Sequence, residues 1–174
     1  MLVSDAIPTV FALALGLGLV GVVVARWFAP EDLRAELRAA AGSLAAVVAV
    51  GATAGSLYFS EVRHFVPCEL CWYQRIFMYP LSVVLTLAVV RRDERVRPYV
   101  CALAGLGALV SIYHVQLQLF PGQGSSCSAG PSCTYQWVDV FGFVSIPVMA
   151  LASFAIILLL LTQRPPVSKD RENE

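Results

Sequence analysis

The chain has 174 residues, of which 58% are hydrophobic and only 14% are charged, and its mean hydropathy is +0.73. An average soluble domain is about 45–50% apolar and about 25% charged, so this composition is that of a membrane protein. Twelve basic and twelve acidic residues give a formal net charge of zero. The composition therefore argues against a soluble protein and gives no sign of a nucleic acid or another polyanion as partner.

Five stretches are long and apolar enough to predict membrane-spanning helices, which need about 20 apolar residues each. They cover residues 7–24, 39–59, 72–90, 99–120 and 144–162. The first stretch is the shortest and, for its length, the richest in glycine. It has no basic residue in front of it, as a cleaved signal peptide normally has, so we expect an uncleaved transmembrane anchor.

The segments between these stretches complete the predicted organisation. The linker 29–38 has Pro30 at a position typical of a first turn and acidic residues next, which predicts a helix that lies along the membrane or extends the following one. Pro80 and Pro147 lie inside apolar stretches and predict kinks. The tail 164–174 has two prolines and mixed charge, which predicts disorder.

Basic residues predict the topology. Ten of the twelve fall in three groups that share one side of the membrane if five helices cross it, and the positive-inside rule makes that side cytoplasmic. The N-terminus and the loops 60–67 and 121–143 are then outside, and the C-terminus is cytoplasmic. The three groups are Arg26, Arg34 and Arg38; Arg91, Arg92, Arg95 and Arg97; and Arg164, Lys169 and Arg171.

Four cysteines form two pairs on the predicted outer side, where disulfides persist. Cys68-Glu-Leu-Cys71 opens the third apolar stretch, and Arg75 follows four residues later. Cys127 and Cys133 lie in the outer loop. Two cysteines three apart can close a reducible ring or hold a metal. A thiolate at a helix start, with an arginine one turn on, is placed to be stabilised as an anion.

Three motifs resemble a known family. Cys68-Glu-Leu-Cys71-Trp-Tyr-Gln-Arg75 resembles the Cys-x-x-Cys-x-x-x-Arg signature of the DsbB/BdbC disulfide bond formation proteins. Residues 113–121, Tyr-His-Val-Gln-Leu-Gln-Leu-Phe-Pro, resemble the end of a later helix in that family, and residues 141–147 resemble the start of its last helix. The resemblance covers about residues 39–163.

The resemblance implies an all-α membrane protein, a four-helix transmembrane bundle, to which this chain adds one extra N-terminal transmembrane helix. Its parts would be an N-terminal helix and cytoplasmic linker helix in residues 1–38, a redox domain in 39–163 and a cytoplasmic tail in 164–174. The implied activity is that of a thiol:quinone oxidoreductase in the cell membrane. Such an enzyme reoxidises an extracytoplasmic thioredoxin-like oxidant, similar to DsbA or BdbD, and passes the electrons to ubiquinone or menaquinone.

The cysteine roles follow from the same resemblance. It implies a Cys68–Cys71 disulfide, with Cys71 next to the quinone, and a Cys127–Cys133 disulfide that meets the soluble oxidant. It also implies that the oxidant attacks Cys127 and that Cys133 exchanges with Cys68. Spacing alone leaves open which loop cysteine is attacked, and whether the resting disulfides lie within the pairs or between them.

Three further residues are expected at the quinone head group. The resemblance places Arg75, His114 and Gln118 there. Arg75 can stabilise both the Cys71 thiolate and negative charge on a quinone oxygen. His114 and Gln118 are four residues apart, so they share one face of a helix near the outer boundary, where both can donate a hydrogen bond to a quinone carbonyl.

Other interpretations remain open on sequence alone. The four outer cysteines can form two structural disulfides in a non-enzymatic membrane scaffold, or a four-thiolate zinc site. A quinone reductase similar to vitamin K epoxide reductase also has two cysteine pairs, but its loop pair precedes the Cys-x-x-Cys motif and here it follows. Cys101 reads as a small buried apolar residue.

Overall fold

The computed structural model describes residues 3–123, 127 and 131–163. The predicted tail, 164–174, lies outside the described residues, as do six positions of the outer loop. Within the described residues the chain is helical and has no strand, apart from a single β-bridge between Val140 and Val144. The prediction of an all-α membrane protein is confirmed.

Each predicted apolar stretch forms one α-helix. The five helices are α1 (Val3–Phe28), α2 (Glu31–Leu57), α3 (Glu69–Arg91), α4 (Arg97–Leu119) and α5 (Ile146–Leu161). The first four are long and apolar enough to cross a membrane. α5 has 16 residues, about 24 Å of helix, which is shorter than a hydrocarbon core of about 30 Å. It is shorter than the predicted stretch because Val144 and Ser145 belong to the preceding loop.

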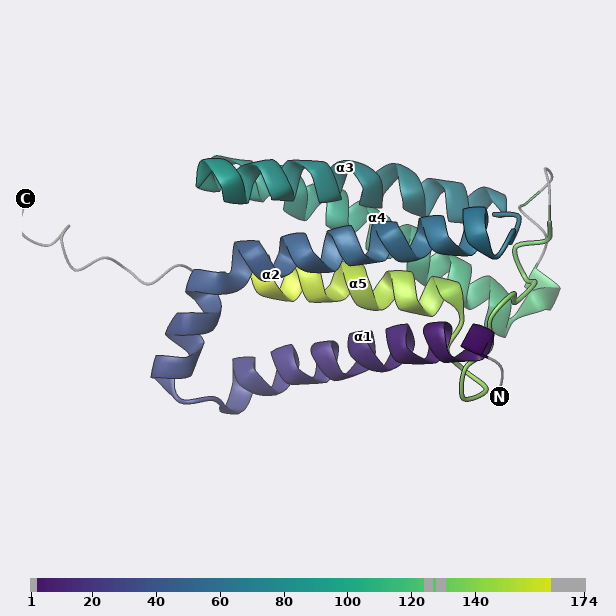
Figure 1. Cartoon of the computed structure of the whole chain (residues 1–174), viewed down its shortest axis with the longest axis horizontal. Coiled ribbons are helices and arrows are strands. Elements are labelled where there is room, and N and C mark those ends of the chain that lie inside the picture. The colour runs from purple at the N-terminus through teal and green to yellow at the C-terminus, as the bar shows by residue number, and fades with distance from the viewer. Residues whose placement is uncertain (1–2, 124–126, 128–130, 164–174) are drawn as a thin grey trace, which may run out of the picture.

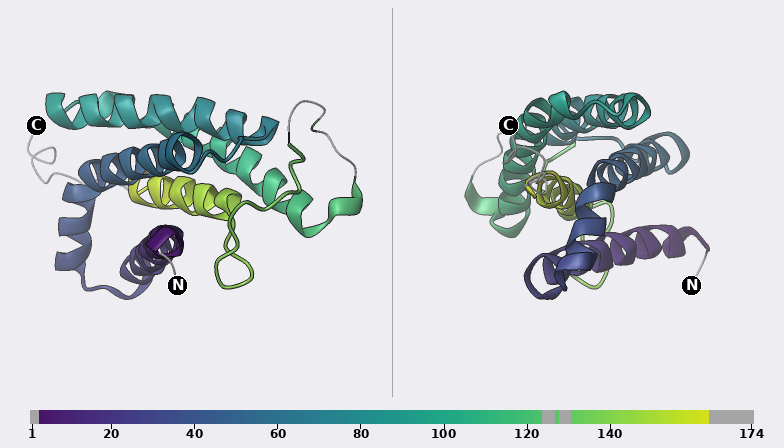
Figure 2. Two further views of the ribbon diagram at one scale, coloured as in Figure 1. Left: turned by 45° about the vertical axis from the view of Figure 1, so that its right-hand side comes forward. Right: turned by 90° about the vertical axis from the view of Figure 1, so that its left-hand side faces the viewer.

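Helices α2 to α5 form a bundle, and α1 lies outside it (Figure 1). Successive helices from α2 to α5 pack against one another, and α5 closes the bundle against α2. α1 packs mainly on α5 and lies away from α3 and α4 (Figure 2). Gly107 allows the close approach of α4 and α5, because the ring of Phe154 occupies the space that a Cβ atom at this position would need.

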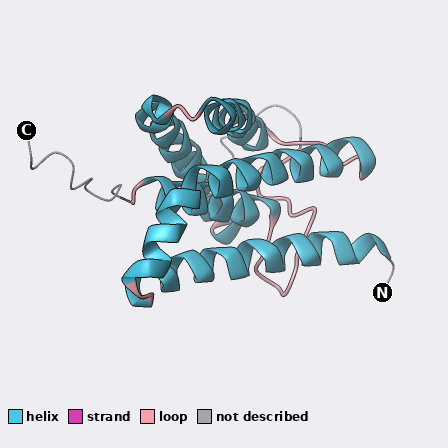
Figure 3. Cartoon of the chain, turned by 60° about the vertical axis from the view of Figure 1, so that its left-hand side comes forward, coloured by secondary structure: helices cyan, strands magenta, loops and turns pink. Residues whose placement is uncertain are grey.

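Pro30 and Pro147 lie at the starts of helices. Pro30 precedes the first turn of α2, so the predicted linker helix extends the following helix, and its first turns run across the end of the bundle (Figure 3). Pro80 lies inside α3, and the kink predicted there stays a prediction. Pro147 lies in the first turn of α5, where its missing N–H has no helical partner to lose. The prediction of a kink at Pro147 is therefore wrong.

The two ends of the bundle carry different groups. At one end, Arg26 donates a hydrogen bond to the carbonyl oxygen of Leu159 over 3.3 Å, and Arg97 donates to those of Leu161, over 2.5 Å, and Gln163. Leu159 and Leu161 lie in the last turn of α5, where carbonyls have no partner in the helix, so the arginines satisfy them. The opposite end holds the start of α3, the end of α4 and both cysteine pairs (Figure 1).

Candidate redox site

The Cys-x-x-Cys motif forms the first turn of α3. Cys68 is the N-cap, with extended backbone angles (φ −75°, ψ 174°), and its Sγ accepts a hydrogen bond from the backbone N–H of Cys71 over 3.4 Å. The thiol thus takes the place of the oxygen that usually caps a helix. The two Sγ atoms lie 2.8 Å apart and are not bonded to each other. The Cys68–Cys71 disulfide stays a prediction.

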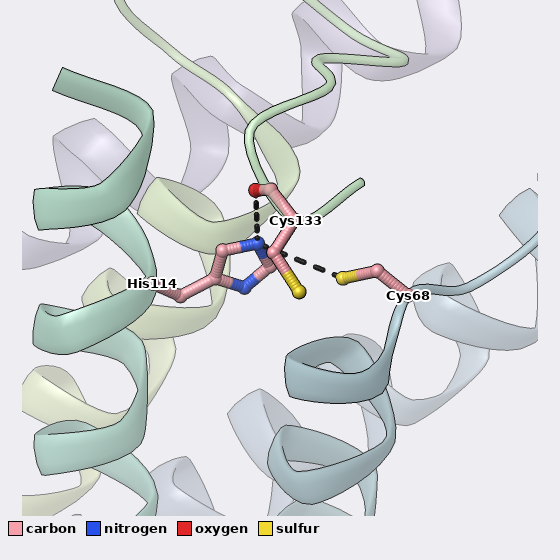
Figure 4. Close-up of side chains that lie close together, drawn as sticks. All are labelled: Cys68, His114 and Cys133. Carbon is pink, nitrogen blue, oxygen red and sulfur yellow. Dashed lines mark hydrogen bonds between the residues drawn. The ribbon is translucent and has the colours of Figure 1, made fainter. Parts of the chain in front are cut away.

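The outer loop brings the second pair onto this turn. Cys127 and Cys133 are joined by a disulfide, with their Cα atoms 6.0 Å apart. Cys133 is buried, whereas Cys127 is only half-buried. The sulfur of Cys133, the sulfur of Cys68 and a ring nitrogen of His114 all lie within 4.8 Å of one another (Figure 4). The fold therefore places a sulfur of each pair beside one imidazole.

His114 connects these groups. It lies on α4 and is 1% exposed. Its Nε2 lies 3.0 Å from the carbonyl oxygen of Cys133 and 3.7 Å from the Sγ of Cys68, and its Nδ1 lies 3.4 Å from the amide nitrogen of Gln74. A carbonyl oxygen only accepts, so the network assigns the proton to Nε2 and makes Nδ1 the acceptor for Gln74. If the ring gains a proton, Gln74 can turn its amide and accept in place of donating.

Electrostatics favour negative charge on Cys68. The hydrogen bond from the Cys71 thiol, helped by His114, lowers the pKa of Cys68 to about 4, although burial acts in the opposite direction. Arg75 one turn on led us to expect the stabilised thiolate at Cys71. In the reduced pair the N-cap position favours Cys68, because its sulfur also faces the N–H groups at the start of the helix.

Arg75 and Cys71 line one pocket. The guanidinium is held by two hydrogen bonds to Ser56, from Nε to Oγ over 3.0 Å and from Nη2 to the carbonyl oxygen over 3.1 Å, and it lies 5.1 Å from the ring centroid of Trp72. The remaining walls are mostly apolar and come from α1, α2, α3, α5 and both outer loops. They include Phe11, Phe59, Phe65, Trp137, Met78 and Met149.

His114 and Gln118 line a second, smaller pocket beneath the outer loop, with Cys68 and Cys71. Gln118 is held there by the hydroxyl of Ser145, which donates to its Oε1 over 2.6 Å. The structure therefore does not bring the three predicted quinone ligands into one pocket, because Arg75 lines the first pocket only. Cys71 lines both pockets, and so lies between them.

Sequence reasoning missed Gln74 and Ser56. Gln74 is 5% exposed, lines the Arg75 pocket and bonds His114. Its signal was available, because an amide inside a membrane helix is costly and so marks a functional position. Ser56 gave no signal, because its role depends on the packing of α2 against α3.

The arrangement suits thiol–disulfide exchange better than metal binding. Cys68, His114 and Cys133 are residues of the type that bind zinc. However, metals bind thiolates, and the sulfur of Cys133 is bonded to Cys127. Exchange instead needs a thiolate close to a disulfide sulfur, and Cys68 and Cys133 meet that requirement.

Comparison with known proteins agrees with this chemistry. The family model described as "Disulfide bond formation protein DsbB" matches residues 38–163. The chain belongs to the DsbB family. The matched range contains both cysteine pairs, Arg75 and His114, whereas α1 lies before it.

Curated relatives of this DsbB family member carry corresponding names. Disulfide bond formation protein C of Bacillus subtilis (strain 168) is 48% identical over 117 residues, which are 66% of this chain and 85% of the relative. Probable disulfide formation protein C 1 of Bacillus cereus (strain ATCC 10987 / NRS 248) is 49% identical over 61% of this chain and 78% of its own length. No solved structure matches the chain. Membership of the DsbB family gives the chain an oxidoreductase role in disulfide bond formation.

Proposed function

We propose that this protein is a membrane thiol:quinone oxidoreductase that oxidises an extracytoplasmic thioredoxin-like protein and delivers two electrons to a membrane quinone. The observation that carries this proposal is the contact between the two cysteine pairs. Cys68, Cys133 and His114 have their reactive atoms within 4.8 Å, and Cys71 opens onto a separate apolar pocket. The cysteines thus link a site beneath the outer loop to a site among the helices.

The first exchange takes place at the outer loop. A thiolate of the partner, a DsbA-like or BdbD-like protein, attacks the sulfur of Cys127 and displaces Cys133 as a thiolate. The second thiol of the partner then attacks its own mixed-disulfide sulfur, which releases the oxidised partner and leaves Cys127 as a thiol. Burial supports this order, because Cys133 is 1% exposed and a protein partner cannot reach it, whereas Cys127 is only half-buried.

The second exchange passes the electrons inward. The thiolate of Cys133 attacks Cys68 in the Cys68–Cys71 disulfide and displaces Cys71. Cys127 then attacks Cys133, which restores the loop disulfide and leaves Cys68 and Cys71 reduced. His114 donates from Nε2 to the Cys133 carbonyl, which holds this part of the loop over α3. The same nitrogen lies 3.7 Å from the sulfur of Cys68, which leaves as a thiolate when Cys127 attacks Cys133.

The residues of the Arg75 pocket fit a quinone head group. Aromatic and methionine side chains supply apolar walls, and Arg75 supplies a cation whose position is fixed by Ser56. A bound quinone, ubiquinone or menaquinone, accepts two electrons and two protons. Arg75 would orient a quinone carbonyl and offset negative charge on its oxygen, and Cys71 lies in the same pocket. His114 and Gln118 lie in the other pocket, so we assign His114 to the exchange between the cysteine pairs.

The orientation in the membrane is part of the proposal. The predicted cytoplasmic arginines of the described residues and the two cysteine pairs lie at opposite ends of the bundle. The positive-inside rule then puts the cysteine end outside, where thioredoxin-like oxidants act. A membrane-impermeant thiol reagent on intact, reduced cells should label Cys127 and leave Cys101 unlabelled. Labelling of Cys101 alone would reverse the orientation.

The decisive experiment is quinone reduction by the purified protein. A reduced thioredoxin-like oxidant is supplied with ubiquinone or menaquinone, and quinol is followed by its ultraviolet absorbance. We expect quinol formation by the wild type and by the control Cys101→Ser, and none by Cys71→Ser. If the wild type forms no quinol and all four outer cysteines stay oxidised, the pairs are structural disulfides and the proposal is wrong.

A further inference from the structure

The extra helix α1 reaches the pocket that contains Arg75 and Cys71. Phe11 lines this pocket, although it lies before the matched range 38–163. Its ring packs on α2 at Gly55, where a Cβ atom would lie 2.9 Å from the ring. A residue with a side chain at position 55 would force Phe11 away. The contact therefore fixes one point of α1 against the bundle, at the pocket.

A second space continues from this point. It is an apolar groove between α1, α2 and α5, and Phe11 and Ala52 line both it and the Arg75 pocket. Among the residues that the structure describes, every side chain that lines the groove is hydrocarbon, and two glycines, Gly18 and Gly51, widen it. We call this space the α1 groove; its other lining residues include Leu15, Val22, Leu44, Val48, Ile156 and Leu160.

The groove leads away from the cysteine end. Along α2 the lining residues pass from Ser56 in the Arg75 pocket through Ala52 to Leu44 in the groove. The step from Ala52 to Leu44 is about 12 Å along the helix. α5 shows the same order, from Ser153 in the pocket to Leu160 in the groove. The two spaces thus lie end to end, with Phe11 and Ala52 at their common border, in the direction that leads from the Arg75 head-group site toward the other end of the bundle.

We propose that α1 is a wall of the quinone site, in which Phe11 closes the head-group pocket and the α1 groove holds the prenyl tail. The inference rests on the proposed function and adds a binding element that the DsbB-matched part of the chain lacks. The tail is a hydrocarbon, so it must leave the pocket through an apolar opening. Toward the outer loop the neighbouring pocket is lined by Cys68, His114 and Gln118, whereas the α1 groove has no polar side chain among its described lining residues.

Filling the groove tests this proposal. In Gly18→Leu the first added carbon meets only Ile156, at an ordinary 3.7 Å, so the rest of the leucine should occupy the groove. Gly51→Leu fills it from the facing wall, where a Cβ atom meets nothing within 4 Å. The matched control is Gly16→Leu, on an exposed position of α1 where a Cβ atom also meets nothing within 4 Å.

The readout is quinone binding without turnover, measured by quenching of tryptophan fluorescence, since Trp137 lines the pocket. The probes are menadione, which has no tail, and the same naphthoquinone with four isoprene units, together with the corresponding tailless and tailed ubiquinones. Partitioning into the detergent or bilayer is the same for every variant. The comparison between variants therefore isolates the groove.

We expect Gly18→Leu and Gly51→Leu to weaken binding of the tailed quinones about tenfold, or about 1.4 kcal/mol. Binding of the tailless quinones should stay within about twofold of wild type, and Gly16→Leu should behave as wild type for both. If both groove variants bind the tailed quinones as wild type does, the tail runs elsewhere and lipid chains fill the groove. If the wild type binds no quinone of either kind, the proposed function itself fails.

Discussion

The two ends of the bundle use buried and half-buried polar groups in opposite ways. At the arginine end, Arg26 and Arg97 donate to backbone carbonyls of α5, which cannot change their chemistry. At the cysteine end, the polar contacts join side chains that can exchange bonds or protons. Cys68 accepts from Cys71 and lies beside His114, and His114 is held between Gln74 and the Cys133 carbonyl.

The arginine end therefore stabilises the bundle, and the cysteine end carries out the chemistry. A hydrogen bond to a helix-end carbonyl has one arrangement, so it stabilises a single structure. The groups at the cysteine end have several arrangements. A sulfur can be a thiol, a thiolate or half of a disulfide, and an amide can turn. Substitutions at the cysteine end should therefore change reaction rates, and substitutions at the arginine end should change stability.

The largest effect should come from Cys133→Ser. With no sulfur at position 133 the loop cannot exchange with Cys68, so turnover with the protein partner should fall by at least about 1000-fold, to the level of the uncatalysed reaction. Stopped-flow oxidation of the reduced thioredoxin-like partner measures this loss. Cys101→Ser, the substitution of the cysteine outside both pairs, should be neutral. Normal turnover in Cys133→Ser would show that the two pairs do not act in series.

The next largest effect should be on the pKa of Cys68, which a titration of the reduced pair measures. Its pKa is lowered, so the reduced pair should carry a thiolate at neutral pH and lose it only as the pH falls through about 4. Thiolate absorbance near 240 nm, measured in a Cys101→Ser, Cys127→Ser, Cys133→Ser background, follows this step. Cys71→Ala removes the main cause and should raise the midpoint most, and His114→Ala should raise it less.

The second histidine of the chain is the control for this titration. His64 is exposed and has a left-handed backbone (φ 57°), which asparagine tolerates, so His64→Asn should leave the midpoint unchanged. A midpoint near the ordinary value of about 8.5 in the wild type would contradict the role given to the N-cap.

Arg75→Ala should weaken the reaction with the quinone and leave the reaction with the protein partner unchanged. Arg75→Ala removes the cation held by Ser56, so the KM for quinone should rise by about tenfold, the equivalent of one charge-assisted hydrogen bond of about 1.5 kcal/mol. The rate at which the partner reduces the loop disulfide should not change, because Arg75 does not line the loop pocket. An equal loss in both half-reactions would mean that Arg75 stabilises the structure of the protein and does not act on the quinone.

Sequence alone predicted the five helices because apolar stretches of membrane length are a direct physical signal. It also singled out the two outer cysteine pairs, through the Cys-x-x-Cys spacing and the family resemblance, and the structure places a sulfur of each pair beside His114. It could not predict that Arg75 and His114 face different pockets, since that depends on how α3 turns relative to α2 and α4. The contact of Phe11 with Gly55 was equally invisible, because neither residue carries a signal for the other.

The start of α5 shows the limit of composition as a guide. Val144 and Ser145 are apolar or small and extend the predicted stretch, yet Val144 pairs with Val140 in a β-bridge and Ser145 bonds Gln118. Local hydropathy does not record such contacts. They depend on how the outer loop folds between α4 and α5, which brings residues that are apart in the sequence into contact.

The smallest effect on activity should come from the arginine end, at Arg97. Arg97→Ala removes the donor to the carbonyls of Leu161 and Gln163, which should destabilise the protein by about 1–2 kcal/mol and lower its Tm in detergent by a few degrees. Arg95→Ala, at an exposed position two residues before α4, is the matched control and should leave Tm unchanged. Turnover of folded Arg97→Ala should stay near that of wild type. A rate loss as large as that of His114→Ala would mean that the two ends are coupled, and that the division between a structural end and a chemical end is wrong.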